Sequence, residues 1–167
     1  MQSWMNQTER NILQELIEKY NPKTVLEIGT CEGASTLILA SMGAKVATID
    51  KNQVSGLGDN IYCVTGNSHD IEVITYAANI LKSVDFIFID GDHTKEGVYL
   101  DAINCYSLLF IPGIMVFHDI YNPEVIKGID KFRKQYPPTS EMIYNTIPAI
   151  DPIQDVVWGG LRSLHYD

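Results

Sequence analysis

The sequence predicts an α/β protein built on a doubly wound, mostly parallel sheet with an antiparallel hairpin at its C-terminal edge. Two observations predict this class. Short apolar runs of strand length alternate with stretches of helical length, which is typical of parallel sheets covered by helices. Near the C-terminus the alternation stops, because two strand-like runs follow one another without room for a crossover helix.

The parallel part is predicted from five apolar runs and the helices that separate them. Apolar residues recur at helical spacing over residues 4–20, and Asn21-Pro22 stops this first helix. The predicted strands are 24–28, 45–49, 61–64, 84–89 and 113–117. Further helices are expected at 34–42, 70–82, 95–109 and 123–135. This alternation places helices on both faces of the sheet.

The C-terminal part of the chain carries the expected hairpin. Its two strand-like runs are 142–144 and 156–164. Residues 145–155 between them contain Pro148 and Pro152, which favour a loop over a helix. We therefore expect the last two strands to pair antiparallel at the sheet edge.

Length and charge limit the domain count and the classes of partner. The 167 residues fit one domain, with an N-terminal helix at 1–21, a cofactor-binding core at 22–120 and the last helix and edge hairpin at 121–167. A formal net charge of −9 argues against nucleic acid or an anionic membrane as a partner. No apolar run approaches the roughly 18 residues that span a bilayer, and the N-terminus lacks the apolar segment of a signal peptide. We expect a cytoplasmic protein.

A glycine-bearing turn follows the first predicted strand. Gly29 and Gly33 allow the backbone to pass close to a ligand at the start of the next helix. Asp50 ends the following strand, where its carboxylate can accept hydrogen bonds from both hydroxyls of a ribose. Because ligands bind at the carboxyl ends of the strands in doubly wound sheets, these features predict a bound nucleoside.

Details of this turn distinguish between nucleosides. A dinucleotide fingerprint has glycine at its first, third and sixth positions, which here are Gly29, Cys31 and Ala34. The missing middle glycine removes the space for a pyrophosphate. Glu27 adds a carboxylate just before the turn, which suits an amino group better than a phosphate. A nucleoside with an amino-acid tail therefore fits better than a dinucleotide.

From these residues the chain resembles the class I S-adenosylmethionine-dependent methyltransferases, which have a Rossmann-like fold. More narrowly, it is similar to the small-molecule O-methyltransferases of the catechol and caffeoyl-CoA type. It is also similar to the bacterial family of macrocin O-methyltransferases and cephalosporin hydroxylase-like proteins. The likeness covers about residues 22–120 by motif and the remainder by strand order only. It implies the order 3-2-1-4-5-7-6 for the seven predicted strands.

The resemblance also implies which residues bind the cofactor S-adenosylmethionine. The pattern G-x-x-x-G-x-S runs from Gly29 to Ser35, and Ser35 falls where the family holds the methionine carboxylate. Asp50 falls at the ribose position, and residues 66–69 fall where the family lines the adenine ring. The full predicted set is Glu27, Gly29, Thr30, Gly33, Ser35, Asp50, Lys51, Gly66, Asn67, Ser68, His69 and Asp90.

Asp90, His118 and Asp119 are candidates for a metal site at the ends of the fourth and fifth strands. The resembled family holds a divalent metal there, with an aspartate after the fourth strand and an acidic pair or Asp-Asn after the fifth. Asp90 and Asp119 carry over directly, which implies magnesium or manganese, and Mg²⁺ prefers oxygen ligands. His118 departs from the pattern. It is either a third ligand, for a softer ion such as manganese, iron or zinc, or a group outside the ligand shell.

His93 is the candidate general base. It lies three residues after Asp90, where the resembled catechol-type enzymes have a catalytic lysine. Methyl transfer to a hydroxyl requires removal of its proton, and an imidazole with the ordinary pKa near 6.5 accepts a proton at neutral pH. In the alternative interpretation, Asp92 and His93 only cap the helix that begins near Thr94. We interpret Asp92 as structural.

The leading hypothesis is an S-adenosylmethionine-dependent O-methyltransferase that acts on a hydroxyl of a small molecule with the help of a divalent metal. A nicotinamide-dependent oxidoreductase and a non-catalytic S-adenosylmethionine-binding protein are the alternatives. Candidates for an apolar substrate wall are Tyr121, Ile147 and Trp158. With no inserted cap domain expected, the substrate pocket is either shallow or completed by a second subunit in a homodimer.

Overall fold

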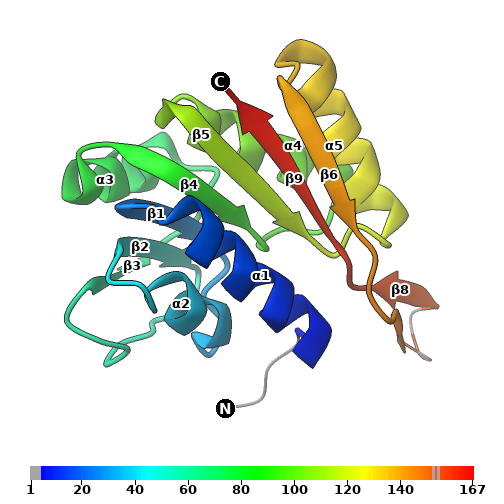
Figure 1. The fold of residues 1–167 in the computed structure, drawn as a ribbon, viewed down its shortest axis with the longest axis horizontal. Coiled ribbons are helices and arrows are strands. Elements are labelled where there is room, and N and C mark those ends of the chain that lie inside the picture. Colours follow the sequence, from blue (N-terminus) through cyan, green and yellow to red (C-terminus); the bar gives the residue numbers. More distant parts are fainter. Residues whose placement is uncertain (1–4, 152, 154) are drawn as a thin grey trace.

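The main sheet of the computed structural model has seven strands in the order β3-β2-β1-β4-β5-β9-β6, and β9 takes the place of the predicted seventh strand (Figure 1). The structure describes residues 5–151, 153 and 155–167. The parallel strands are β1 (Thr24–Ile28), β2 (Lys45–Asp50), β3 (Ile61–Thr65), β4 (Val84–Ile89) and β5 (Leu109–His118). β9 (Leu161–Tyr166) pairs antiparallel with β5 and with the edge strand β6 (Ser140–Tyr144). The predicted strand order and edge hairpin are confirmed.

Helices cover both faces of this sheet (Figure 1). α1 (Gln7–Tyr20) and α2 (Ala34–Leu39) pack on one face, where Leu13 and Ile17 share a buried cluster with Phe86 and Phe88 of β4. The other face carries α3 (Ile71–Leu81), α4 (Lys95–Tyr106) and α5 (Pro123–Gln135), with Phe132 among its fully buried side chains. Because both faces are covered, the central strands are apolar on both sides.

The first helix starts later than predicted, at Gln7, because Asn6 caps it. The Asn6 side chain accepts a hydrogen bond from the backbone N–H of Glu9 (3.0 Å), and the backbone N–H of Asn6 donates to the Glu9 carboxylate (2.9 Å). This reciprocal pair is a capping box, which satisfies backbone donors at a helix start. Trp4, where the predicted helix begins, lies outside the described residues. The helices predicted at 34–42 and 95–109 also end early, and Leu109 already belongs to β5.

The C-terminal region differs from the prediction in two places. The run predicted as one strand, 156–164, is divided between β8 (Val156–Trp158) and β9, because Gly159 and Gly160 have φ values of +109° and +76° and turn the chain. The segment predicted as a loop contains β7 (Ala149–Asp151), which pairs antiparallel with β8. Pro152, part of the predicted loop, lies outside the described residues. β5 also begins four residues earlier than predicted, before the cis Ile111-Pro112 bond.

The carboxyl ends of the parallel strands meet at one edge of the sheet, and the start of α1 and the β7–β8 ribbon lie toward that same end (Figure 1). Asn6, the cap of α1, donates a side-chain hydrogen bond to the carbonyl of Ile147 (3.1 Å), in the segment that leads into β7. Among the described residues, no helix combines the length and apolar character needed to cross a membrane. The division of the chain at residues 21 and 120 stays a prediction.

Candidate functional site

Gly29 begins the turn after β1 and packs against the end of β4. Its φ of +94° lies in the region that favours glycine. A Cβ atom at this position would collide with the backbone carbonyl of Asp90. The close approach of two strand ends therefore requires glycine here, whether or not a ligand also approaches the turn.

A cavity of about 250 Å³ lies across the ends of β1, β2 and β3 and reaches the end of β4. Asp50 lines this cavity, and its carboxylate accepts hydrogen bonds from the backbone N–H groups of Cys31 (2.8 Å) and Asn52 (2.8 Å). These bonds fix the carboxylate at the end of β2. A carboxylate can accept about four hydrogen bonds, so Asp50 retains capacity for ligand hydroxyls.

The predicted cofactor residues fall into two groups. Those that line the cavity are Gly29, Asp50, Lys51, Gly66, Ser68 and Asp90. Those placed around it rather than in its lining are Glu27, Thr30, Gly33, Ser35, Asn67 and His69. Asp92, which we interpret as structural, also lines the cavity, and its side chain accepts a hydrogen bond from the N–H of Thr94 (2.8 Å) at the start of α4. Asn52 is a lining residue that sequence reasoning missed, because it belongs to no motif.

Glu27 lies beneath the glycine turn and is fully buried. Its two carboxylate oxygens accept hydrogen bonds from the hydroxyls of Ser35 (2.6 Å) and Thr36 (2.5 Å). Burial raises the pKa of Glu27 to about 7, despite these hydrogen bonds. Thr30 is buried as well, with its hydroxyl 2.5 Å from that of Thr48. The side chains of Glu27, Thr30, Ser35 and Thr36 therefore face the interior, where they hold the shape of the turn, whereas Glu32 is exposed.

His69 and Ser68, in the turn after β3, contact residues of α4. Nε2 of His69 lies 3.4 Å from the carboxylate of Asp101, which is fully buried. The side chain of Asn104 donates a hydrogen bond to the carbonyl of Ser68 (3.1 Å). Burial raises the pKa of Asp101 above its ordinary value. Helix α4 thus fixes the turn after β3, so that Gly66 and Ser68 can line the cavity.

Three side chains that can bind a metal converge beside this cavity. Asp90 follows β4, His93 lies three residues later, and Asp119 follows β5; one ligand atom from each lies within 4.8 Å of the others. Nε2 of His93 is 3.0 Å from Oδ2 of Asp119 and 3.6 Å from Oδ1 of Asp90. Two carboxylates and an imidazole form a donor set suited to a divalent ion. His93, expected as the base, therefore stands where His118 was expected as a possible third ligand.

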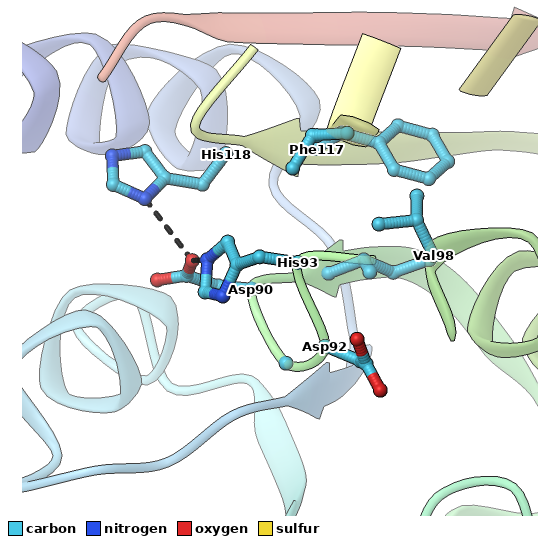
Figure 2. Close-up of a pocket in the computed structure, with 9 residues that line it drawn as sticks. Asp90, Asp92, His93, Val98, Phe117 and His118 are labelled. Atoms are coloured by element: carbon cyan, nitrogen blue, oxygen red, sulfur yellow. Dashed lines mark hydrogen bonds and ion pairs between the residues drawn. The ribbon is translucent and has the colours of Figure 1, made fainter. Parts of the chain in front are cut away.

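His118 does not belong to this group of three, although its Nδ1 lies 3.4 Å from Oδ2 of Asp119. Its ring is buried between Asp90 and Glu9 of α1: Nδ1 lies 3.1 Å from Oδ1 of Asp90, and Nε2 lies 3.3 Å from Oε2 of Glu9. Figure 2 shows the interaction with Asp90 and shows Asp92 turned away from both histidines. Both ring nitrogens of His118 thus face carboxylates.

The convergence of charges changes the acidity of several groups. Burial alone would lower the pKa of His93, but hydrogen bonds to Asp119 and Asp90 outweigh it and raise the pKa to about 9. Burial alone would also lower the pKa of His118. The charge of Asp90 and contacts with Asp119 and Glu9 outweigh burial and raise this pKa well above 6.5. The pKa of Asp119 is held below its ordinary value by the two imidazoles, against the effect of burial.

Glu9 and Trp158 are neighbours of the site, and sequence reasoning did not place Glu9 there. Asn6-x-x-Glu9 has the spacing of a capping box, which signals a helix start but not a position beside a strand end. Trp158 packs edge-on against His93, with ring centroids 5.0 Å apart. It was expected only as one of several candidates for a substrate wall, and the contact confirms that it lies beside the site.

A comparison of the sequence with protein families finds one described as a methyltransferase domain, which matches residues 26–120 and so more than half of the chain. Among curated proteins, an uncharacterized protein, R132, of Acanthamoeba polyphaga mimivirus is 24% identical over 143 residues. The match covers 72% of this chain and 65% of the viral protein, so the chain spans less than two thirds of that relative's length.

Solved structures with the same fold include several methyltransferases. The O-methyltransferase from Bacillus cereus, in complex with SAH, is 20% identical with a TM-score of 0.70; the match covers 96% of this chain and 82% of that one. The MycE methyltransferase from the mycinamycin biosynthetic pathway, in complex with magnesium and SAH, is 14% identical with a TM-score of 0.64. That match covers 98% of this chain and 50% of MycE. At these identities the likeness shows the fold.

Proposed function

The chain belongs to a family of methyltransferase domains, and from this premise we propose that it transfers the methyl group of S-adenosylmethionine to a hydroxyl of a small molecule. One observation carries the proposal. Asp90 lines the cavity at the strand ends and is also a member of the Asp90–His93–Asp119 group. A ligand in the cavity would therefore present its reactive end to a cluster of acid and base groups. Solved structures of the same fold that hold SAH support this choice of donor.

The residues of the cavity fit a nucleoside with a positively charged tail. Asp50 has accepting capacity for ribose hydroxyls at the end of β2. Asp90 and Asp92 add carboxylates to the lining, which favour a sulfonium over a pyrophosphate. Cys31 lies in the lining where a dinucleotide-binding turn needs glycine. These features support S-adenosylmethionine over a nicotinamide dinucleotide.

The proposed reaction is a direct displacement. When bound, S-adenosylmethionine supplies a methyl group activated by its sulfonium. The hydroxyl oxygen of the substrate forms a bond to the methyl carbon, the carbon–sulfur bond breaks, and its electron pair remains on sulfur as a thioether. His93, expected as the general base, takes the hydroxyl proton. Holding the two reactants in line is the remaining contribution of the protein.

We further propose that Asp90 and Asp119 hold a divalent cation, magnesium or manganese. Such an ion would favour the anionic form of a coordinated substrate oxygen. His93 is available either as a third ligand or as the base, but not as both at once, because the same Nε2 faces the two carboxylates. With a pKa of about 9, His93 holds a proton at neutral pH. It can accept one only where another cation neutralises the carboxylates.

The substrate would lie beside Trp158. Its indole packs against His93, and Ile147 on the adjoining segment is 76% exposed. Tyr121 is anchored to this segment, because its hydroxyl donates to the carbonyl of Thr146 (2.9 Å) and accepts from the N–H of the same residue (2.6 Å). This arrangement supports a substrate with an apolar or aromatic body next to its hydroxyl.

The proposal is tested by binding and by turnover. Calorimetry should show binding of S-adenosylhomocysteine and no binding of NAD. A panel of aromatic and aliphatic alcohols is then incubated with S-adenosylmethionine labelled on its methyl group, with and without a chelator. We expect label transfer to an aromatic hydroxyl, reduced by the chelator. Binding of NAD alone would favour an oxidoreductase, and binding of S-adenosylhomocysteine without transfer to any substrate would favour a non-catalytic binding protein.

A further inference from the structure

Glu9 brings the first turn of α1 to the ends of β4 and β5. Its side chain is buried, with 1% of its surface exposed, and Oε2 lies 3.3 Å from Nε2 of His118. Buried carboxylates need partners that replace water. The partners of Glu9 come from four separate parts of the chain, which is more than the capping of one helix requires.

Each oxygen of the Glu9 carboxylate has its own partners. Oε1 accepts hydrogen bonds from the N–H of Gly160 (2.9 Å) and the hydroxyl of Thr146 (2.8 Å), while Oε2 accepts from the N–H of Asn6 (2.9 Å) and faces His118. A Cβ atom at Gly159 would lie 2.6 Å from Oε1, so the glycine pair leaves room for this carboxylate. These hydrogen bonds therefore fix the position of the Glu9 carboxylate independently of the His118 imidazole.

His118 connects Glu9 to Asp90, because its two ring nitrogens face the two carboxylates. The imidazole is 4% exposed, so its nitrogens find their partners inside the protein. Nε2 faces Oε2 of Glu9 at an ion-pair distance of 3.3 Å without a hydrogen bond. Nδ1 lies 3.1 Å from Oδ1 of Asp90 and 3.4 Å from Oδ2 of Asp119. With the Glu9 carboxylate fixed, the imidazole of His118 has one orientation in which Nε2 faces Glu9 and Nδ1 reaches Asp90. Groups that orient a metal-binding side chain in this way set the affinity of its site.

We propose that Glu9 is a positioning residue that acts through His118 to orient the carboxylate of Asp90. His118 in this arrangement is a bridge between α1 and Asp90 and not a ligand. The effect on metal binding rests on the proposed function, whereas the coupling between Glu9 and His118 does not. The competing explanation is that Glu9 only caps α1.

Glu9→Gln separates the two explanations. The amide oxygen of glutamine can still accept from the N–H of Asn6, so the capping box remains available. With this oxygen in the place of Oε2, the amide N–H group takes the place of Oε1, where it cannot accept from the N–H of Gly160. The negative charge beside His118 is lost. Glu15→Gln is the matched control, since Glu15 lies exposed on the same helix.

The first measurement uses metal-free protein. Urea unfolding is followed for wild type, Glu9→Gln, His118→Gln and the double variant, with Glu15→Gln alongside. We expect Glu9→Gln to lower the urea midpoint more in the wild-type background than in the His118→Gln background, because coupled residues are non-additive. The part of the shift common to both backgrounds reports the lost acceptor for the N–H of Gly160. Equal shifts in both backgrounds, or no shift, would overturn the proposal.

The second measurement titrates Mn²⁺ into the same folded variants with S-adenosylhomocysteine bound. We expect Glu9→Gln to weaken Mn²⁺ binding roughly 10-fold or more, as loss of an orienting partner usually does. The affinity for S-adenosylhomocysteine and the Glu15→Gln control should be unchanged. Unchanged Mn²⁺ affinity in Glu9→Gln would overturn the action on Asp90. If wild type binds no Mn²⁺, the metal proposal fails, and the urea measurement alone upholds or overturns the Glu9–His118 coupling.

Discussion

Two buried glutamates stand on opposite sides of the site, and their pKa values shift in opposite directions. Glu27, under the glycine turn, has a pKa raised to about 7 by burial. Glu9, at the end of β5, has a pKa lowered to about 2, although burial alone would raise it. Both side chains are at most 1% exposed. Burial therefore does not by itself decide the charge of either residue.

The identity of the partners explains the difference. Glu27 receives hydrogen bonds from Ser35 and Thr36, which carry no charge. Glu9 meets the imidazole of His118 in addition to two backbone N–H groups and a hydroxyl. Hydrogen bonds that involve a charged group are about twice as strong as neutral ones. Glu27, on the side of the proposed nucleoside cavity (the nucleoside side), is thus easily protonated. Glu9, on the side of Asp90, His93 and Asp119 (the acidic side), keeps its charge.

Gly29→Ala should have the largest effect, because Gly29 joins the two sides. The added Cβ would collide with the carbonyl of Asp90 and would sit at a positive φ. We expect a loss of more than about 3 kcal/mol in the free energy of unfolding, from backbone strain together with the collision. Urea unfolding measures it, with Gly43→Ala as a control, since Gly43 also has a positive φ but open space around it. Equal losses in both variants would leave strain alone as the cause.

The pH dependence of stability should reveal the raised pKa of Glu27. Glu27 has a folded pKa of about 7, above its ordinary 4.5, so the folded state binds this proton more tightly. The stabilisation is complete below pH 4.5 and is lost as the pH rises through 7. A shift of this size corresponds to at most about 3 kcal/mol. Urea midpoints of wild type and Glu27→Gln at pH 5 and pH 8 measure it. Parallel pH profiles for the two proteins would contradict the prediction.

His93→Ala should affect turnover on the acidic side while leaving the nucleoside side intact. Loss of a general base usually reduces turnover by roughly 100-fold or more. Steady-state kinetics and calorimetry with S-adenosylhomocysteine and Mn²⁺ measure the change. We expect nearly unchanged affinity for both ligands. Weaker Mn²⁺ binding would identify His93 as a ligand instead, and unchanged turnover would exclude both roles.

Asp50→Asn should have the smallest effect. In contrast to His93→Ala, it should weaken ligand binding and leave turnover nearly unchanged. Asparagine keeps one accepting oxygen but loses the charge, so we expect roughly 10-fold weaker binding of S-adenosylhomocysteine. Mn²⁺ affinity and the turnover at saturating S-adenosylmethionine should change little. If Asp50→Asn instead reduced turnover as much as His93→Ala, the division of the site into two sides would be wrong.

Much of the fold was predictable because it follows from local patterns. The alternation of strand-length and helix-length segments predicted the parallel sheet, and the missing crossover helix predicted the antiparallel edge. Gly29 and Asp50 were placed correctly at strand ends because a strand's end is visible where its apolar run stops. The β7–β8 ribbon was missed, since three-residue strands give almost no periodic signal.

The sequence by itself determined the order of the elements and which polar residues end each strand. Hydrophobic periodicity is a local property of the chain, and it specified both. Only the tertiary structure decided what those residues face. Glu9 and Gly160 are 151 positions apart and meet through one hydrogen bond, and His93 rather than His118 completes the group of side chains that could hold a metal. Such contacts depend on how helices pack across the sheet, which no pattern in one segment encodes.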